Sequence, residues 1–428
     1  MNTLHETETQ KSAAVRHPVQ RTKILAALED KDTNIQYDDA LENEMVLNMG
    51  PQHPATHGVL RILIKLDGET VVAAVPELGY LHRGYEKLAE NCSYHEFIPH
   101  TDRLDYLSPL MNNTAYVLAV EKLIGIETPR RTKFIRVIIS ELARISSHCL
   151  WLGALAMDVG ALTVFLWTFR EREKLYDIFE KLTGARFTTS YTRVGGLEQD
   201  MTDDVKATIQ QFIDQFPEKL DECERLLNRN RIFIDRTDGV GVISRDKAVA
   251  LGMTGPNLRA VGIEHDLRRA APYLVYNELD FDIPTFNGGD SLARYYVRIN
   301  EMKQCVRILQ QALEKIPAGP IHAFETKKVL PRKQRIYTKM EELIQDFMII
   351  NFGIEPPVGE VYHAIEASKG ELGFYIQSRG EGHPWRLKIH SPSFMNLQSL
   401  APLIQGRMIS DIVAIIGSID PVMGEADK

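Results

Sequence analysis

Two histidines, His53 and His57, lie four residues apart in the segment MGPQHPATHG, residues 49–58. Such pairs bind metal when both rings lie on one helix face, but Pro54 directly follows His53 and disfavours helical backbone there. Two alternatives stay open: loop histidines that cap or pack locally, and a proton donor, because imidazole titrates near neutral pH. A proton donor needs a partner that fixes its tautomer. The candidate partner is Asp158, a carboxylate in an apolar stretch that must be paired or protonated.

Charged and phenolic side chains gather in PHTDRLDYLSP, residues 99–109, just before an apolar run. Arg103, Asp105 and Tyr106 gather at the start of a predicted helix and are candidates for chemistry. Helix capping is the plainer interpretation, with Asp102 or Asp105 accepting backbone N–H bonds and Arg103 in solvent. This stretch by itself favours capping.

The chain ends in IVAIIGSIDPVMGEADK, residues 412–428. Asp-Pro followed by Met-Gly is ordinary turn chemistry. The apolar run before it has the composition of a strand, and its position predicts that the end of the chain is buried.

Composition excludes several classes of protein. Among 428 residues, 44% are hydrophobic and 25% charged, with a net charge of −8, which argues against broad binding to nucleic-acid phosphates. Neither a zinc knuckle nor a disulfide framework is indicated, because no CxxC pair occurs among the four cysteines, Cys92, Cys149, Cys223 and Cys305. GxGxxG, GxxxxGK[ST] and GxSxG are absent, so nucleotide-binding and hydrolase motifs are missing.

One apolar stretch, residues 149–169, has the length of a membrane span. Asp158 at its centre would be costly in a bilayer, and residues 132–148 run into it with helical spacing. A buried core helix or helix pair is therefore predicted instead. Residues 1–44 are polar and lack sustained periodicity, which predicts an extension, with no acid-poor transit peptide or apolar leader.

Periodicity predicts the elements that position these residues. Residues 45–75 alternate around an Asp-Gly turn, which indicates a hairpin or small sheet. Helical spacing predicts long helices at 108–125, 132–148, 150–184, 203–229 and 290–316. Residues 231–288 are rich in loops, and 356–428 are expected to return to short strands and turns. The predicted fold class is α+β, a bundle of long helices flanked by small β-sheets.

A series of motifs carries a family resemblance over residues 45–428. In order they are GPQHPATHGVLR, ELGYLHRGYEK, TDRLDYL, MDVGALTVFLWTFREREK, RVGGL, TGPNLRAVGIEHDLRRAAPY, GELGFYIQS, KIHSPSFMNLQSL and IIGSIDPVMGEADK. The chain resembles the D subunit of the proton-pumping NADH–quinone oxidoreductase, respiratory complex I. Residues 1–44 lie outside the resemblance, which implies one domain at 45–428. Its parts would be a sheet region at 45–80, a helical core at 81–330 and a C-terminal α/β region with a buried terminus at 331–428.

That family is itself similar to the large subunit of nickel–iron hydrogenases, where two cysteine pairs hold the metals. The resemblance places Asp105 and Ser108 at the first pair and Val422 and Glu425 at the second. No thiolate remains for a soft metal. It implies a hydrogenase-large-subunit-like fold whose emptied cavity, beside Asp420, receives something else.

In the resembled family the emptied cavity receives a quinone headgroup. The resemblance implies that His57 and Tyr106 hydrogen-bond the two quinone carbonyls and that Asp158 supports His57. His53 is expected to shape the loop, with a proton relay as the alternative. A histidine and a phenolic O–H would stabilise and then quench charge on the quinone oxygens.

Electrons would arrive from an iron–sulfur cluster in the neighbouring B subunit, because this chain shows no cofactor ligands of its own. Arg103 matches an arginine near that cluster, and Thr188 stands where the family often has histidine. Threonine does not titrate at physiological pH, so the hypothesis is a cluster of lower, less pH-dependent potential, suited to menaquinone rather than ubiquinone.

The resemblance also implies the assembly. The B and C subunits and the H subunit of the membrane arm are the expected partners, and the chain would be inactive when isolated. The expected location is the cytoplasmic side of a bacterial inner membrane, where the chain would be peripheral and coupled to proton translocation. A purely structural scaffold is the alternative, and a working hydrogenase is disfavoured because the cysteines are missing.

Overall fold

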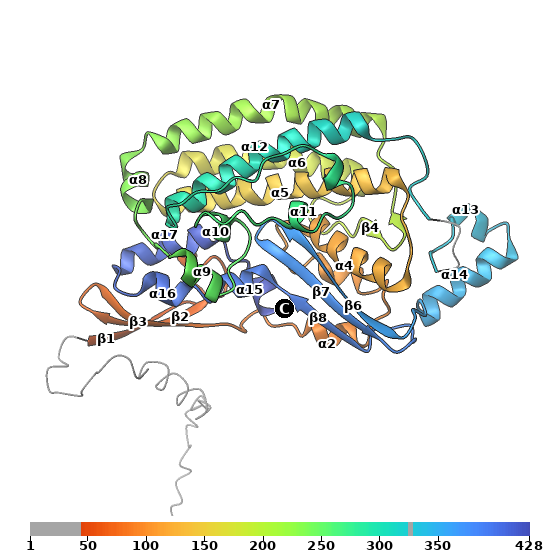
Figure 1. The fold of residues 1–428 in the computed structure, drawn as a ribbon, viewed down its shortest axis with the longest axis horizontal. Helices are drawn as coiled ribbons and strands as arrows, with labels where there is room; N and C mark the ends of the chain where they lie inside the picture. Colours follow the sequence, from red (N-terminus) through yellow and green to blue (C-terminus); the bar gives the residue numbers. More distant parts are fainter. Residues whose placement is uncertain (1–43, 324–327) are drawn as a thin grey trace, which may run out of the picture.

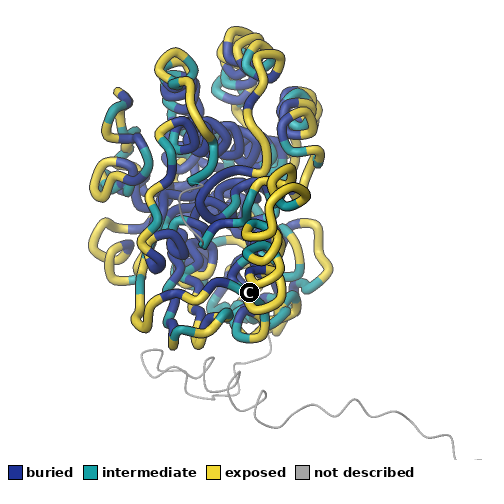
Figure 2. The backbone as a smooth tube through the Cα atoms, turned by 90° about the vertical axis from the view of Figure 1, so that its right-hand side faces the viewer, coloured by how far each residue is buried: buried dark blue, intermediate teal, exposed yellow. Residues whose placement is uncertain are grey.

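The computed structural model describes residues 44–323 and 328–428 (Figure 1). Except for its last residue, the predicted N-terminal extension 1–44 lies outside the described residues. Buried residues fill the middle of the molecule, and exposed residues follow its outer turns (Figure 2).

An antiparallel sheet opens the described chain. Its strands are β1 (Glu44–Met49), β2 (Arg61–Asp67) and β3 (Thr70–Glu77), in the order β1-β2-β3. The β2–β3 turn contains Gly68 with a φ of 58°, a left-handed conformation that glycine adopts without steric cost. The predicted hairpin is confirmed. The His53–His57 segment lies in the β1–β2 connection, around the short 3-10 helix η2 (Pro54–Thr56).

Long helices form the core, and α5 is at its centre. The helices are α4 (Pro109–Ile124), α5 (Arg130–Asp158), α6 (Leu162–Thr183), α7 (Asp203–Asn228) and α12 (Ser291–Lys315). Figure 1 shows α5, α6, α7 and α12 side by side, with the sheets beneath them. The helix pair predicted across residues 132–184 is confirmed, but the predicted boundary at residue 149 is wrong, because α5 continues to Asp158 and the break lies at 159–161. Within the described ranges, no helix has the length and apolarity needed to span a membrane.

Short elements connect the core helices. They are α2 (Tyr85–Ala89), α3 (Ile98–Thr101), β4 (Thr192–Arg193), β5 (Gly196–Leu197), α8 (Arg231–Thr237), α9 (Arg245–Ala250), α10 (Pro256–Arg259), α11 (Leu267–Ala270) and η3 (Tyr276–Glu278). The region 231–288 is therefore rich in loops, as predicted. Three of its short helices, α8, α9 and α11, begin at side-chain caps, as at Ser244, whose hydroxyl accepts the backbone N–H of Lys247.

A second three-stranded antiparallel sheet packs against α4. Its strands are β6 (Gly359–Ala367), β7 (Gly370–Ser378) and β8 (Arg386–His390), and α4 packs against β6 and β7. Before it, α13 (Lys333–Ile336) and α14 (Met340–Phe352) lie at one end of the molecule (Figure 1).

The chain ends in four helices. The expectation that strands and turns continue over residues 356–428 as far as the terminus is therefore wrong. They are α15 (Pro392–Leu397), α16 (Leu400–Ile404), α17 (Ile409–Ile419) and α18 (Met423–Asp427). The run IVAIIGSI, predicted as a strand, belongs to α17. Burial at nearly every position from Ile412 to Ile419 removes the amphipathic pattern, so a short apolar helix and a buried strand have the same composition. The described residues thus form the predicted α+β mixture of helical core and small sheets.

Candidate functional site

A histidine and a carboxylate far apart in sequence meet at the end of α5. His57 Nε2 lies 2.7 Å from Asp158 Oδ2, and their side chains are only 13% and 10% exposed. Asp158 is the last residue of α5, where the helix dipole disfavours negative charge. The contact with the His57 ring gives this carboxylate a hydrogen-bond partner at the helix end.

His53 has a local contact instead. Its Nδ1 accepts the backbone N–H of Ala55 at 3.2 Å, and its carbonyl accepts the N–H of Thr56 at 3.0 Å. The exposed His53 ring therefore caps η2 and shapes the loop that carries His57. The structure does not bring His53 to the His57–Asp158 pair as a metal ligand.

Helix α17 packs directly on the pair through a glycine. A Cβ at Gly417 would lie 3.6 Å from both His57 Nε2 and Asp158 Oδ2, and 3.0 Å from a methyl of Leu155. The indole N–H of Trp151 donates to the Gly417 carbonyl at 2.7 Å, which fixes the close approach. Sequence reasoning missed Gly417, and the available signal was a glycine inside an apolar run.

Tyr106 is half-buried, and its ring centroid lies 6.4 Å from that of Phe187. Among the described residues, its hydroxyl has no hydrogen-bond partner. Burial, together with the negative charges of Asp105 and Asp420, raises the pKa of Tyr106, against a lowering by Arg83. The phenol therefore keeps its proton and can donate it to a ligand atom.

Asp105 is buried at the start of α4 and accepts several hydrogen bonds. Its Oδ1 accepts the Leu107 N–H at 3.1 Å, and its Oδ2 accepts the Ser108 hydroxyl and, at 3.0 Å, the Ser368 hydroxyl. The expected helix capping by Asp105 is wrong, because α4 begins after Ser108 without a side-chain cap and the bond to Leu107 lies in the turn before the helix. Asp102 instead accepts the Ser190 N–H at 3.0 Å.

A buried lysine links this aspartate to the end of the chain. Lys369 donates to Ser147 Oγ at 2.9 Å and to the carboxylate of Asp420, and Ser147 donates to Ser368 at 3.2 Å. Asp420, which ends α17, lies in the left-handed region with a φ of 61°. We call the group Asp105, Ser108, Ser147, Ser368, Lys369, Asp420 and Glu425 the terminal polar cluster.

Glu425 is the least satisfied member of the terminal polar cluster. Its Oε1 accepts the Ser391 hydroxyl at 3.1 Å and the Ser393 N–H at 3.0 Å, while Oε2 is buried with no hydrogen-bond partner in the described chain. Burial first, and then the charge of Asp105, raise the pKa of Glu425 to about 8. The raised pKa means that this site favours the neutral form of Glu425.

The terminal segment 417–427 contacts both halves of the predicted site. At the His57 loop, a Cβ at Gly58 would lie 3.1 Å from Met423. At the segment that carries Tyr106, a Cβ at Gly424 would lie 2.7 Å from the Leu104 carbonyl oxygen. The Asp427 carboxylate accepts the N–H groups of residues 79 and 81 at 2.9 and 2.7 Å, which locks the end of the chain in place.

Arg103 and Thr188 are both exposed, on neighbouring segments. Asp102 joins these segments, because it accepts both the N–H and the hydroxyl of Ser190. The two side chains are thus open to a partner. Among the described residues, the Arg103 guanidinium is hydrogen-bonded only to the Pro99 carbonyl, at 3.1 Å.

A second buried group of charges lies between α5, α12 and β6. Glu301 is its hub and pairs with Arg144, Arg259 and Arg268 at 3.2–3.3 Å. The side chains of the full set are all essentially unexposed. We name this set the central ion cluster, and it consists of Glu141, Arg144, His148, Arg259, Asp266, Arg268, Glu301 and Glu366. Sequence analysis predicted none of these pairings.

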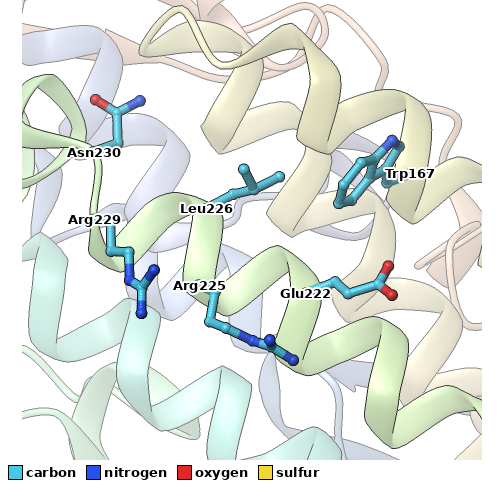
Figure 3. Close-up of a pocket in the computed structure, with 6 residues that line it drawn as sticks. All are labelled: Trp167, Glu222, Arg225, Leu226, Arg229 and Asn230. Atoms are coloured by element: carbon cyan, nitrogen blue, oxygen red, sulfur yellow. The ribbon is translucent and has the colours of Figure 1, made fainter.

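A groove of about 330 Å³ lies on the outside of the bundle (Figure 3). Trp167 of α6 faces it from one side and residues of α7 and its end from the other, namely Glu222, Arg225, Leu226, Arg229 and Asn230. It contains none of the sequence-predicted site residues. Across residues 44–323 and 328–428, no group of three or more His, Cys, Asp or Glu side chains is placed to hold a metal.

These features define a class: an α+β protein in which a buried histidine–aspartate pair and a buried polar cluster both meet the segment 417–427. Comparison with known proteins narrows the class. Residues 158–428 match the family described as respiratory-chain NADH dehydrogenase, 49 Kd subunit. The chain is 63% identical over 410 residues to a D subunit of the NADH-quinone oxidoreductase of Chloroherpeton thalassium, covering 95% of this chain and 93% of the relative.

Two other relatives are also D subunits of NADH-quinone oxidoreductase. The D subunit from Salinibacter ruber is 55% identical over 391 residues, 91% of this chain and 87% of the relative. The D subunit from Methylacidiphilum infernorum is 57% identical over 384 residues, 90% and 92% of the two chains. The chain belongs to the family of NADH-quinone oxidoreductase D subunits, the 49 kDa subunits of complex I, and is thus part of an enzyme complex.

Proposed function

We propose that this protein forms the quinone headgroup site of its complex, with His57 and Tyr106 as the two hydrogen-bond and proton donors. The observation that carries the proposal is the terminal segment 417–427, which contacts the His57–Asp158 pair at Gly417 and the Tyr106-bearing segment at Gly424. One rigid support therefore holds both donors. The unpartnered Tyr106 hydroxyl is available to a quinone oxygen.

Each donor has a distinct part. Reduction places negative charge on the quinone oxygens, which donors in a water-poor site stabilise and then protonate. His57 commits Nε2 to Asp158, so Nδ1 is the ring nitrogen left to donate. Asp158 is a positioning residue, because its charge stabilises the protonated ring and its contact fixes the tautomer.

The former metal cavity is the proposed origin of this site, in a hydrogenase-large-subunit-like fold. Two of the four positions matched to metal-binding cysteines, Asp105 and Ser108, are hydrogen-bonded to each other. At a third position, the charge of Asp105 contributes to the raised pKa of Glu425. Their convergence in one buried polar cluster supports a cavity that exchanged sulfur ligands for oxygen groups.

Electrons are proposed to reach the quinone from an iron–sulfur cluster of the B subunit, at the exposed edge that carries Arg103 and Thr188. A cation at position 103 would favour the reduced, more negative cluster. We further propose contacts with the C subunit and with the H subunit of the membrane arm, a peripheral position on the cytoplasmic side of a bacterial inner membrane, and coupling of the reaction to proton translocation. The isolated chain would be inactive.

The experiment is quinone reduction by the intact complex carrying Tyr106→Phe or His57→Ala. Removing a direct proton donor is expected to lower turnover by about 10²-fold or more. NADH oxidation by a water-soluble artificial acceptor should persist, because electron entry does not use these side chains. Matched controls are Tyr337→Phe and His383→Ala, whose side chains are well exposed and lie outside the proposed site. Unchanged quinone turnover in both site variants would favour a structural scaffold and refute the proposal.

The choice of quinone rests on Thr188. We propose menaquinone as the substrate, with a cluster potential that changes little with pH, because threonine carries no titrating group. A redox titration of the cluster in the intact complex should be nearly flat between pH 6 and 8, and Thr188→His should make it steeper. A steep dependence in the unmodified complex would rule this out in favour of ubiquinone.

A further inference from the structure

The last turn of α17 is held by side chains from other parts of the chain. In an α-helix the last four carbonyls have no partner within the helix. Three of these carbonyls in α17, those of Gly417, Ser418 and Ile419, each accept an N–H from a buried side chain. Because Gly417 packs on the His57–Asp158 pair, the donors that fix this turn also fix what lies against the pair.

The three donors come from three different helices. Trp151 of α5 donates its indole N–H to the Gly417 carbonyl at 2.7 Å. Arg298 of α12 donates to the next two carbonyls at 2.9 and 3.1 Å, and Asn257 of α10 donates to the second of these at 3.0 Å. The Arg298 guanidinium also lies over the Trp151 ring, 4.6 Å from its centroid, so these two donors hold each other in place.

A second arginine of α12 grips the same turn through a side chain. Arg294 donates to the Ser418 hydroxyl at 2.9 Å, and to the carbonyls of Gly241 and Gly289 at 2.7 and 3.1 Å. It therefore ties the end of α17 to the loops on either side of α9 and α10. We name the four donors the carbonyl clamp, which consists of Trp151, Asn257, Arg294 and Arg298.

The two arginines of the carbonyl clamp are completely buried and form no ion pair with any described residue. Burial is the main cause that lowers the pKa of Arg294 to about 9 and that of Arg298 to about 10. A buried cation without a paired carboxylate lowers the free energy of unfolding, and the negative end of a helix offsets only part of that loss. Such an arrangement fixes position at the expense of stability, which is typical of residues that serve a functional site.

We propose that the carbonyl clamp is a set of positioning residues that holds the end of α17 against the His57–Asp158 pair during quinone reduction. This inference rests on the proposed function. Gly417 packs beside both groups of the pair, whose side chains are only 13% and 10% exposed. Movement of this turn away from the pair would admit water and loosen the orientation of the His57 ring. The clamp therefore acts on the chemical step through the pair and does not touch the quinone.

Trp151→Phe in the intact complex tests the clamp, because it removes one N–H donor and leaves an aromatic ring under Arg298. We expect kcat for quinone reduction to fall about fivefold with little change in KM, as for the loss of one hydrogen bond. NADH oxidation by an artificial acceptor should be unchanged. The matched control is Trp385→Phe, at a ring that is 44% exposed and outside the clamp. An unchanged kcat in Trp151→Phe, or a change confined to KM or to thermal stability, would overturn the inference.

A double-mutant cycle distinguishes positioning from a general loss of stability. Two residues that act through one contact have non-additive effects. In an Asp158→Asn background the pair is already weakened, so adding Trp151→Phe should lower kcat by less than about twofold. Losses that multiply would show that the clamp does not act through the pair, which would also overturn the inference.

Arg298→Lys replaces Trp151→Phe in these measurements if the latter does not assemble. Lysine keeps the positive charge but lacks the rigid fork that reaches two carbonyls. The same loss of kcat, and the same non-additivity with Asp158→Asn, are expected. Full turnover in Arg298→Lys, or losses that multiply with those of Asp158→Asn, would count against the clamp.

His57→Ala, measured in the same series, distinguishes the two proposals. If His57→Ala loses turnover while the losses of Trp151→Phe and Asp158→Asn multiply, only the carbonyl clamp fails. If His57→Ala retains full turnover, the proposed quinone site itself fails, and the inference about the clamp fails with it.

Discussion

The molecule contains two buried groups of charge that differ in how their acids are neutralised. In the central ion cluster, guanidinium groups face the carboxylates. Burial would raise the pKa values of Glu141 and Glu301, but the arginine charges outweigh it and lower them. In the terminal polar cluster, hydroxyl groups take the place of most cations, and the pKa of Glu425 is raised. Arginine pairs hold carboxylates in their charged form, whereas burial without a facing arginine favours the neutral form of Glu425.

The difference corresponds to a structural role for the central ion cluster and to the proposed chemistry for the terminal polar cluster. The central ion cluster joins α5, α12 and β6, and each of its arginines meets at least two carboxylates. Only Glu366 departs from the rule, since burial and then Asp266 raise its pKa. The terminal polar cluster lies against the segment that positions His57 and Tyr106. A site that must give up protons needs groups whose charge is not fixed.

The largest effect is expected from Glu301→Ala. It leaves Arg144, Arg259 and Arg268 buried with one carboxylate fewer, and breaking such a network costs about 3–5 kcal/mol. The yield and thermal midpoint of the assembled complex should both fall sharply. The control is Asp235→Ala, which removes an exposed pair on α8 worth at most about 1 kcal/mol. Equal stability of the two variants would refute a structural role for the central ion cluster.

The next largest effect is a difference in how the stability contributed by the two clusters depends on pH. Burial alone would raise the pKa of Asp266, but the charges of Arg268 and Arg259 lower it to about 2. The stabilisation that charged Asp266 contributes is therefore complete above its unfolded pKa near 4 and is lost as pH falls toward 2. The pKa of Glu425 is raised instead, so its charge increasingly opposes folding as pH rises from about 4 to about 8.

Thermal midpoints across pH measure this contrast. Asp266→Asn should destabilise the complex by about 2–3 kcal/mol at neutral pH and progressively less in acid. Glu425→Gln should stabilise the complex relative to the unmodified form, by an amount that grows up to about pH 8. Parallel profiles for the two variants would show that the clusters do not differ in this way.

Asp158→Asn should separate charge from shape at the His57 pair. The amide retains the size of the carboxylate but does not stabilise a protonated imidazole, and a hydrogen bond to a charged group contributes about 1.5–3 kcal/mol. Quinone turnover should fall about 10- to 100-fold in kcat, with little change in KM. Asp411→Asn, at the start of α17, is the matched control. An unchanged pH profile and kcat would exclude Asp158 as a positioning residue.

Gly417→Ala should have the smallest effect. The added methyl meets Leu155 at 3.0 Å, and displacing that neighbour costs about 1 kcal/mol. We expect a loss of quinone turnover of less than about tenfold with assembly preserved. A loss confined to stability, with kcat intact, would mean that α17 supports the fold without positioning His57.

Local patterns predicted much of the fold. The helix at 203–229 was readable because its apolar residues recur on one face, and α7 indeed buries Val205, Ile209 and Phe212. The hairpin followed from alternation around Asp67 and Gly68. α17 could not be identified, because burial at nearly every position from Ile412 to Ile419 leaves no period that separates helix from strand.

The site was predictable only where a residue was conspicuous in its own segment. Asp158 stood out as a charge in an apolar run, and its need for a partner suggested His57, which the structure places beside it. Glu425 stood out only through the hydrogenase resemblance. Its unpartnered oxygen depends on Ser391, Ser393 and Asp105, which reach it from other parts of the chain.

The sequence by itself determined the helices, the hairpin and the complex I family, because periodicity, turn chemistry and motif order are properties of neighbouring residues. Only the tertiary structure decided which charges meet. Glu301 reaches Arg144 across 157 positions, and Lys369 reaches Asp420 across 51. The protonation of a buried acid depends on its distance to opposite charges and on the solvent it has lost, and neither quantity exists until the chain has folded.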